Sequence, residues 1–117
     1  MTGTARIQHI AIRSDAPETL ARFYEDVFGW TRIRSATGGV QMSDGHINIA
    51  ILPLGGDNGL DHFGVKIDSL DEVAAGLEKH KQEARPKPPG RGAEFGIHDP
   101  DGNRIDLSVT GFLRERR

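Results

Sequence analysis

The chain has 117 residues, a formal net charge of −2 and 36% hydrophobic residues, enough for one domain with a modest core. This charge gives no electrostatic reason to bind nucleic acid or an anionic membrane, and we expect neither partner. Because cysteine is absent, disulfides and thiolate chemistry are excluded, and nitrogen and oxygen must hold any metal. The first residues lack a long apolar stretch and no run could span a membrane, so we expect a cytoplasmic location.

The sequence repeats itself at an offset of 53 residues without a gap. The first copy reads H-I-A-I-R-S-D-A-P-E-T-L-A from His9, and the second reads H-F-G-V-K-I-D-S-L-D-E-V-A from His62. We therefore expect a single domain over residues 1–117 that contains two similar modules. The first module covers about residues 5–54 and the second about residues 60–110.

Each copy opens with a strand that carries its histidine on one face and apolar residues on the other. His9 alternates with Ile10 in the first copy, and His62 alternates with Phe63 in the second. The two histidines are therefore expected at the same depth, on the faces turned away from the helices.

An amphipathic helix follows each strand, with apolar residues at positions i, i+3, i+4 and i+7 that form one stripe. The pairs Asp15/Glu18 and Ser69/Glu72 have the spacing of capping boxes, and Gly29 suits the end of the first helix.

Short strands separated by turns follow each helix. We expect them over residues 31–36, 40–43, 46–54, 93–98 and 103–109. The prolines of residues 86–92 discourage a further well-defined strand. Both modules then read β-α-β-β-β, which predicts an α+β fold with two tandem βαβββ modules forming a curved mixed sheet around a shared cavity.

The candidate metal ligands are His9, His62 and Asp106. Asp106 stands between Ile105 and Leu107, so alternation turns its carboxylate away from the helix-packed face. Two imidazoles and a carboxylate form a facial set that suits one divalent ion of iron, manganese, nickel, cobalt or zinc. The alternative is two half-buried histidines and a solvated acid, and the repeat argues against it for the histidine pair.

Three segments resemble the vicinal oxygen chelate superfamily of glyoxalase I, methylmalonyl-CoA epimerase, extradiol dioxygenases, fosfomycin resistance proteins and bleomycin-binding proteins. They read H-I-A-I-R-S-D, F-Y-E-D-V-F-G-W and D-P-D-G-N-R-I-D-L, and the resemblance covers roughly residues 6–109. It implies a homodimer with a small-molecule substrate, and it implies that His9, His62 and Asp106 are the family's ligands. The family's last ligand is usually Glu, so the shorter Asp106 would draw the ion closer to its strand.

The sequence gives weaker support for the other candidate site residues. Glyoxalase I and the epimerase use a fourth ligand in the last strand of the first module, where Asn48 has the right alternation. A neutral amide is a poor ligand, so we interpret Asn48 and Gln41 as substrate-binding. His98 and His46 stand beside turns and are candidate catalytic acid–base groups, although turn-edge histidines are commonly exposed and idle.

Two function classes stay open. A metal-dependent enzyme would chelate a small substrate through adjacent oxygens, with dioxygenase-like or lyase/isomerase-like chemistry, and a three-ligand set favours the former. The alternative is a metal-free small-molecule binding protein of the bleomycin resistance type, against which the retained ligands and the few aromatic residues argue. A thiol transferase of the fosfomycin resistance type ranks third, because its potassium-binding loop has no evident counterpart.

Overall fold

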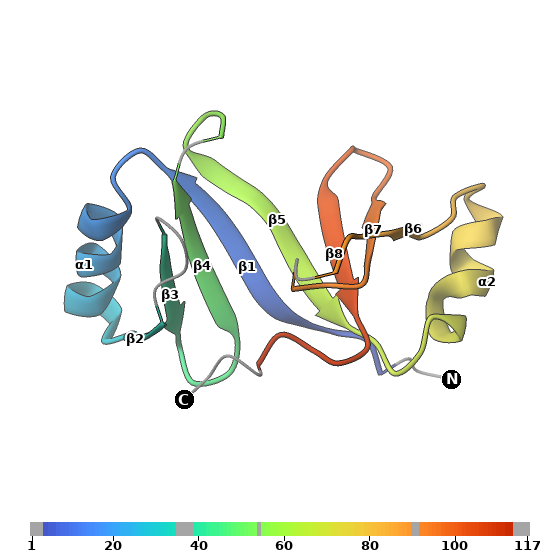
Figure 1. Ribbon diagram of the computed structural model, residues 1–117, viewed down its shortest axis with the longest axis horizontal. Helices are drawn as coiled ribbons and strands as arrows, with labels where there is room; N and C mark the ends of the chain where they lie inside the picture. The colour runs from blue at the N-terminus through green and yellow to red at the C-terminus, as the bar shows by residue number, and fades with distance from the viewer. Residues whose placement is uncertain (1–3, 35–38, 54, 90–91, 114–117) are drawn as a thin grey trace.

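The computed structural model describes residues 4–34, 39–53, 55–89 and 92–113. They form an α+β fold with one eight-stranded mixed sheet and two helices, in the strand order β2-β3-β4-β1-β5-β8-β7-β6. Figure 1 shows β1 and β5 side by side in the middle of the molecule, with α1 and α2 at opposite ends. The predicted fold of two βαβββ modules sharing a curved mixed sheet is confirmed.

The bounds of the elements follow the predicted order. The first module holds β1 (Arg6–Ser14), α1 (Pro17–Phe28), β2 (Thr31–Arg34), β3 (Val40–Ser43) and β4 (Asn48–Pro53). The second holds β5 (Gly59–Lys66), α2 (Asp71–Lys79), β6 (Arg85–Pro86), β7 (Phe95–His98) and β8 (Arg104–Ser108). The short β6 agrees with the proline-rich segment that follows it. Residues 35, 36 and 54, predicted to be in strands, lie outside the described residues.

The hydrophobic core lies between α1 and one face of the first module. Ala21 of α1 packs there with the buried strand residues Val40, Met42, Ile49 and Ile51. These strand residues alternate with polar or small ones, so the opposite face is left for other contacts. In α2, by contrast, no residue is fully buried.

The two predicted capping boxes are wrong. α1 begins at Pro17 without a side-chain cap, and Glu18 instead pairs with Arg32 at 2.8 Å. In α2, Glu72 accepts a hydrogen bond from the N–H of Asp68 and others from Thr4. In each case the glutamate carboxylate that local spacing predicted at the helix end contacts a residue distant in sequence, Arg32 for Glu18 and Thr4 for Glu72.

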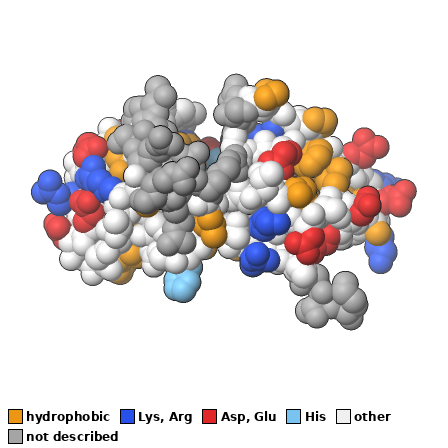
Figure 2. All heavy atoms as spheres, turned by 60° about the horizontal axis from the view of Figure 1, so that its bottom comes forward, with side chains coloured by type: hydrophobic (Ala, Val, Ile, Leu, Met, Phe, Trp, Pro, Cys, Tyr) orange, Lys and Arg blue, Asp and Glu red, His pale blue; other side chains and the backbone are white. Residues whose placement is uncertain are grey.

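Neither described helix is long and apolar enough to cross a membrane. On the face drawn in Figure 2, acidic and basic side chains are interspersed and form no field of one sign.

Candidate metal centre on the inner face of the sheet

The strand register aligns one residue from each strand in a single row across the face opposite α1, which we call the inner face. Residues directly opposite each other on neighbouring strands point to the same side of a sheet. From β2 to β6 the row consists of Thr31, Ser43, Asn48, His9, Gly64, Asp106, Gly96 and Arg85. His9 and Asp106 therefore share a face, with Gly64 between them.

A second row on the inner face passes through His62. From β3 to β7 it consists of Gln41, Ala50, Ala11, His62, Arg104 and His98. Asp106 pairs with Gly64, and Ala50 pairs with Ala11, which is the repeat counterpart of Gly64. The register thus makes Ala50, rather than Asn48, the counterpart of Asp106, so the first module offers no carboxylate at that position.

The imidazole of His9 is held through one nitrogen. Its Nδ1 lies 2.7 Å from Asn48 Oδ1, and Asn48 Nδ2 donates to Gln41 Oε1 at 3.0 Å. Because Asn48 turns its amide nitrogen to Gln41, its oxygen accepts from His9, so Nδ1 carries the proton and Nε2 keeps a lone pair. Burial lowers the pKa of His9 to about 4, against the effect of the Asn48 hydrogen bond, and nearby His62 lowers it further. His9 is therefore neutral at pH 7, as a metal ligand must be.

His62 is held in the same way by a carboxylate. Its Nδ1 lies 2.7 Å from Asp61 Oδ2, and its ring centroid lies 5.3 Å from that of His9. On the other side of the ring, Nε2 lies 3.3 Å from Asp106 Oδ2. If Nδ1 donates to Asp61, then Nε2 and the carboxylate oxygen are both acceptors, and their approach is favourable only with a proton or a cation between them.

Asp61 reaches His62 because it is the extra residue of a β-bulge. The register steps from Ala11↔His62 to Ile12↔Leu60, so Asp61 has no partner residue on β1. Its carboxylate also accepts hydrogen bonds from Arg13 and, at 3.1 Å, from Arg104. Burial opposes ionisation of Asp61, but the hydrogen bonds from His62 and Arg13 outweigh it, so the pKa of Asp61 is lowered and the carboxylate is charged.

A second bulge precedes His9. There the register steps from Ile7↔Val65 to His9↔Gly64, which leaves Gln8 without a strand partner. Gln8 Oε1 accepts a hydrogen bond from the N–H of Phe112 at 3.1 Å. The Phe112 ring stacks on His9 with centroids 5.1 Å apart and planes 7° apart. A Cβ on Gly64 would come within 2.6 Å of that ring, so the glycine is needed for Phe112 to pack there.

Asp106 has a cationic partner of its own. The ammonium of Lys87 lies 3.0 Å from Asp106 Oδ1, while Oδ2 faces His62. Neither Lys87 nor Phe112 belongs to a regular element, so strand and helix patterns gave no signal for them. Asp61 has no sequence signal for another reason: simple alternation predicts that the neighbour of His62 points to the opposite face, and the β-bulge changes its direction.

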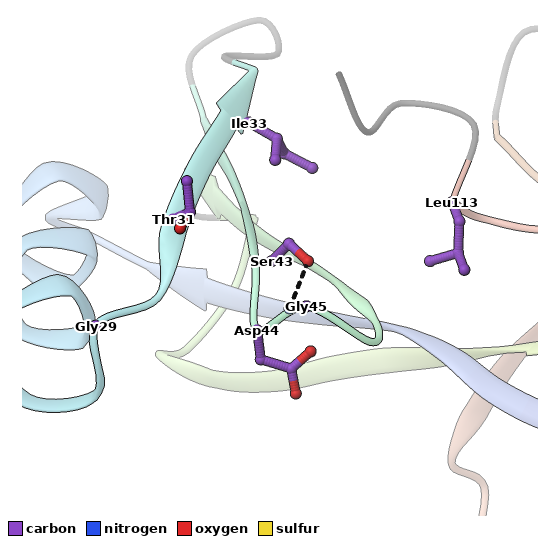
Figure 3. Close-up of a pocket in the computed structure, with 7 residues that line it drawn as sticks. All are labelled: Gly29, Thr31, Ile33, Ser43, Asp44, Gly45 and Leu113. Atoms are coloured by element: carbon purple, nitrogen blue, oxygen red, sulfur yellow. Dashed lines mark hydrogen bonds between the residues drawn. The ribbon is translucent and has the colours of Figure 1, made fainter.

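A cavity of about 570 Å³ opens on the first-module side of the inner face. Figure 3 shows Thr31 and Ile33 on β2 and Ser43 at the end of β3, with Leu113 of the C-terminal segment across from them. Thr31 and Ser43 belong to the row that continues through Asn48 to His9. The cavity therefore lies on the same face as the histidine pair, two strands from His9, and neither histidine lines it.

The structure brings five predicted site residues together and leaves two at a distance. His9, His62 and Asp106 converge, with Asn48 and Gln41 behind His9.

His98 lies on the inner face two strands from His62, about 10 Å away by strand spacing. Its Nδ1 lies 3.2 Å from a guanidinium nitrogen of Arg85, and Gln82 holds its backbone. His46 is exposed in the turn between β3 and β4.

The donor set of His9, His62 and Asp106 meets one requirement of a divalent metal site and does not meet another. Both imidazoles are anchored through Nδ1 by an acceptor, which is how proteins orient metal-binding histidines. Across the ranges that the structure describes, however, no group of three His, Asp or Glu side chains is arranged to hold an ion. Lys87 supplies the cation beside Asp106. The candidate ligands thus have suitable donor atoms, with Asp106 Oδ1 paired to Lys87 and Oδ2 facing His62.

A family model described as the Glyoxalase/Bleomycin resistance protein/Dioxygenase superfamily matches residues 6–107. The chain belongs to this superfamily. A search of curated protein sequences gave no match.

Solved structures of the superfamily share the fold. The chain resembles the 2,3-dioxygenase LapB from Pseudomonas sp. KL28 at a TM-score of 0.70 and 24% identity, covering 93% of this chain and 42% of that one. It resembles methylmalonyl-CoA epimerase from Mycobacterium tuberculosis at a TM-score of 0.67 and 15% identity, covering 92% and 91%. It also resembles homoprotocatechuate 2,3-dioxygenase from Brevibacterium fuscum in complex with 3,4-dihydroxyphenylacetate, at a TM-score of 0.66 and 15% identity, covering 88% and 35%. The chain thus spans less than half of the two dioxygenase chains.

Proposed function

We propose that this member of the superfamily is a metal-dependent enzyme in which His9, His62 and Asp106 bind one divalent ion and a small substrate chelates that ion through adjacent oxygens. The observation that carries the proposal is the matched anchoring of the two imidazoles. Asn48 and Asp61 accept from Nδ1 of His9 and His62, so the Nε2 atoms of both rings are left to face an ion on the same side of the sheet. Iron, manganese, nickel, cobalt and zinc all suit two imidazoles and a carboxylate.

The bound ion would act as a Lewis acid on the chelating oxygens. The protein's own part is to orient the ligands through Asn48, Gln41 and Asp61 and to place the rest of the substrate in the cavity beside Ser43. Phe112 shields the His9 side of the site from water. Asn48 and Gln41 stay candidates for substrate contact as well as supports of His9.

Dioxygenase-like chemistry is the better match within the superfamily. Ala50 occupies the counterpart of Asp106, so the site has three ligands and no carboxylate as a fourth ligand to act as the base of a lyase or isomerase. His98 is the better placed acid–base candidate of the two, since it lies on the inner face with Arg85 at its Nδ1. His46 is exposed in its turn, so the proposal that it acts as an acid or base has less support.

Elemental analysis after loading with iron(II), manganese, cobalt, nickel or zinc tests the proposal. We expect about one ion per chain in the wild type and a loss of at least about tenfold in occupancy in His9→Ala and His62→Ala, because each removes one of only three ligands. His80→Ala is the matched control, since His80 is exposed at the end of α2. Binding that survives both His9→Ala and His62→Ala would refute the assignment.

A metal-free binding protein is the second candidate, and one observation favours it. The Lys87 ammonium already neutralises Asp106, so the inner face holds a charge-balanced pair of groups, with a cavity farther along the same face. A protein that binds none of the five metals but binds small molecules at the histidine pair would support this candidate instead.

We also propose a homodimer. Light scattering on the purified protein measures the mass directly, and the mass of a single chain at micromolar concentration would contradict it.

A further inference from the structure

We propose that Lys87 competes with a divalent ion for Asp106 and thereby sets the metal affinity of the site. This inference rests on the proposed function, because it assumes that Asp106 is a ligand.

The position of Lys87 is well defined. It follows β6, and its backbone N–H donates to the carbonyl of Glu94 at 2.9 Å. Its ammonium lies 3.0 Å from Asp106 Oδ1, with the two side chains 20% and 8% exposed. A contact this well shielded from water is a defined pairing, stronger than a typical surface ion pair.

The pair neutralises the carboxylate that the ion would use. Asp106 has one oxygen at Lys87 and the other 3.3 Å from His62 Nε2. An ion bound to His62 and Asp106 would therefore lie a few ångströms from the ammonium, where two positive charges repel in a poorly hydrated site. This repulsion lowers the affinity for the ion, whether the ion pair persists at Oδ1 or the ammonium moves away.

A purely structural ion pair predicts a different pattern. If Lys87 only ties the segment after β6 to β8, its removal lowers stability and leaves the intrinsic metal affinity unchanged or weaker. If Lys87 competes with the ion, its removal leaves Asp106 an unpaired carboxylate and strengthens metal binding. The direction of the change in dissociation constant separates the two roles.

The experiment titrates the chelator-stripped full chain with zinc, and separately with cobalt(II), in competition with a chromophoric chelator. We expect Lys87→Met to bind about tenfold more tightly than the wild type, which corresponds to one charge-assisted hydrogen bond of about 1.4 kcal/mol. Lys87→Arg keeps the cation and should retain the wild-type affinity. Lys79→Met, at an exposed lysine of α2, is the control for net charge.

Each outcome has one meaning. Tighter binding by Lys87→Met alone supports the inference, and binding by that variant when the wild type binds no metal supports it most strongly. Equal or weaker binding by Lys87→Met, with a bound wild type, overturns the inference and leaves the proposed function standing. Absence of binding in every variant overturns both. Lys87→Gln replaces Lys87→Met if circular dichroism shows that the latter is unfolded.

Discussion

The free energy of unfolding of the chelator-treated protein is expected to fall by about 3 kcal/mol, because of His9 protonation, as the pH falls from about 6.5 to about 4. Burial lowers the pKa of His9 from 6.5 to about 4 in the folded state, so between these values the unfolded chain binds more protons than the folded one. The contribution of His9 is therefore fully present above pH 6.5 and is lost as the pH falls through the folded pKa. Other groups titrate in the same range, so only the difference between variants isolates His9.

Urea unfolding at several pH values in the presence of a chelator measures this effect. His9→Asn retains a donor toward Asn48 but does not titrate, so its stability should fall much less steeply between pH 6.5 and pH 4. His80→Asn, at an exposed position, should keep the wild-type slope. Parallel curves for His9→Asn and the wild type would show that His9 is not held neutral by the fold.

Replacing Asp61 by alanine is expected to weaken metal binding by about 10- to 100-fold, although Asp61 would not contact the ion. Asp61 accepts from His62 Nδ1 at 2.7 Å, and without it the ring can rotate or exchange tautomers. The change also leaves Arg13 and Arg104 without this carboxylate, so the free energy of unfolding should fall by about 1–3 kcal/mol.

Two further variants separate these effects. Asp61→Asn keeps an acceptor for His62 and should weaken metal binding less than Asp61→Ala. Asp57→Ala removes an exposed carboxylate from the same loop region and should change neither quantity, because Arg13 contacts only the backbone carbonyl of Asp57. An Asp61→Ala protein with wild-type metal affinity would show that the anchoring of His62 is irrelevant to the site.

Much of the fold could be predicted because it depends on local patterns. The repeat aligned His9 with His62 in the sequence, and alternation along the strands put both on the face opposite the helices. The structure places their rings 5.3 Å apart. The choice of Asp106 followed from the same alternation, and its Oδ2 lies beside His62.

The parts that could not be predicted depend on irregular backbone or on contacts distant in sequence. The bulge at Asp61 reverses the face expected from alternation, and Lys87 and Phe112 reach the site from segments without a regular pattern. The pairing of Ala50 with Ala11 depends on the register between the parallel strands β1 and β4, which no hairpin turn joins and which the apolar pattern alone leaves open.

The central claim is that His9, His62 and Asp106 share one divalent ion. Anomalous diffraction from crystals loaded with zinc, recorded on both sides of the metal absorption edge, tests it most directly. The account predicts one strong peak on the inner face, about 2.0–2.2 Å from Nε2 of both histidines and from an oxygen of Asp106, with the Lys87 ammonium displaced. A loaded crystal with no peak at the histidine pair, or with Lys87 still bound to Asp106 and the zinc elsewhere, would contradict it.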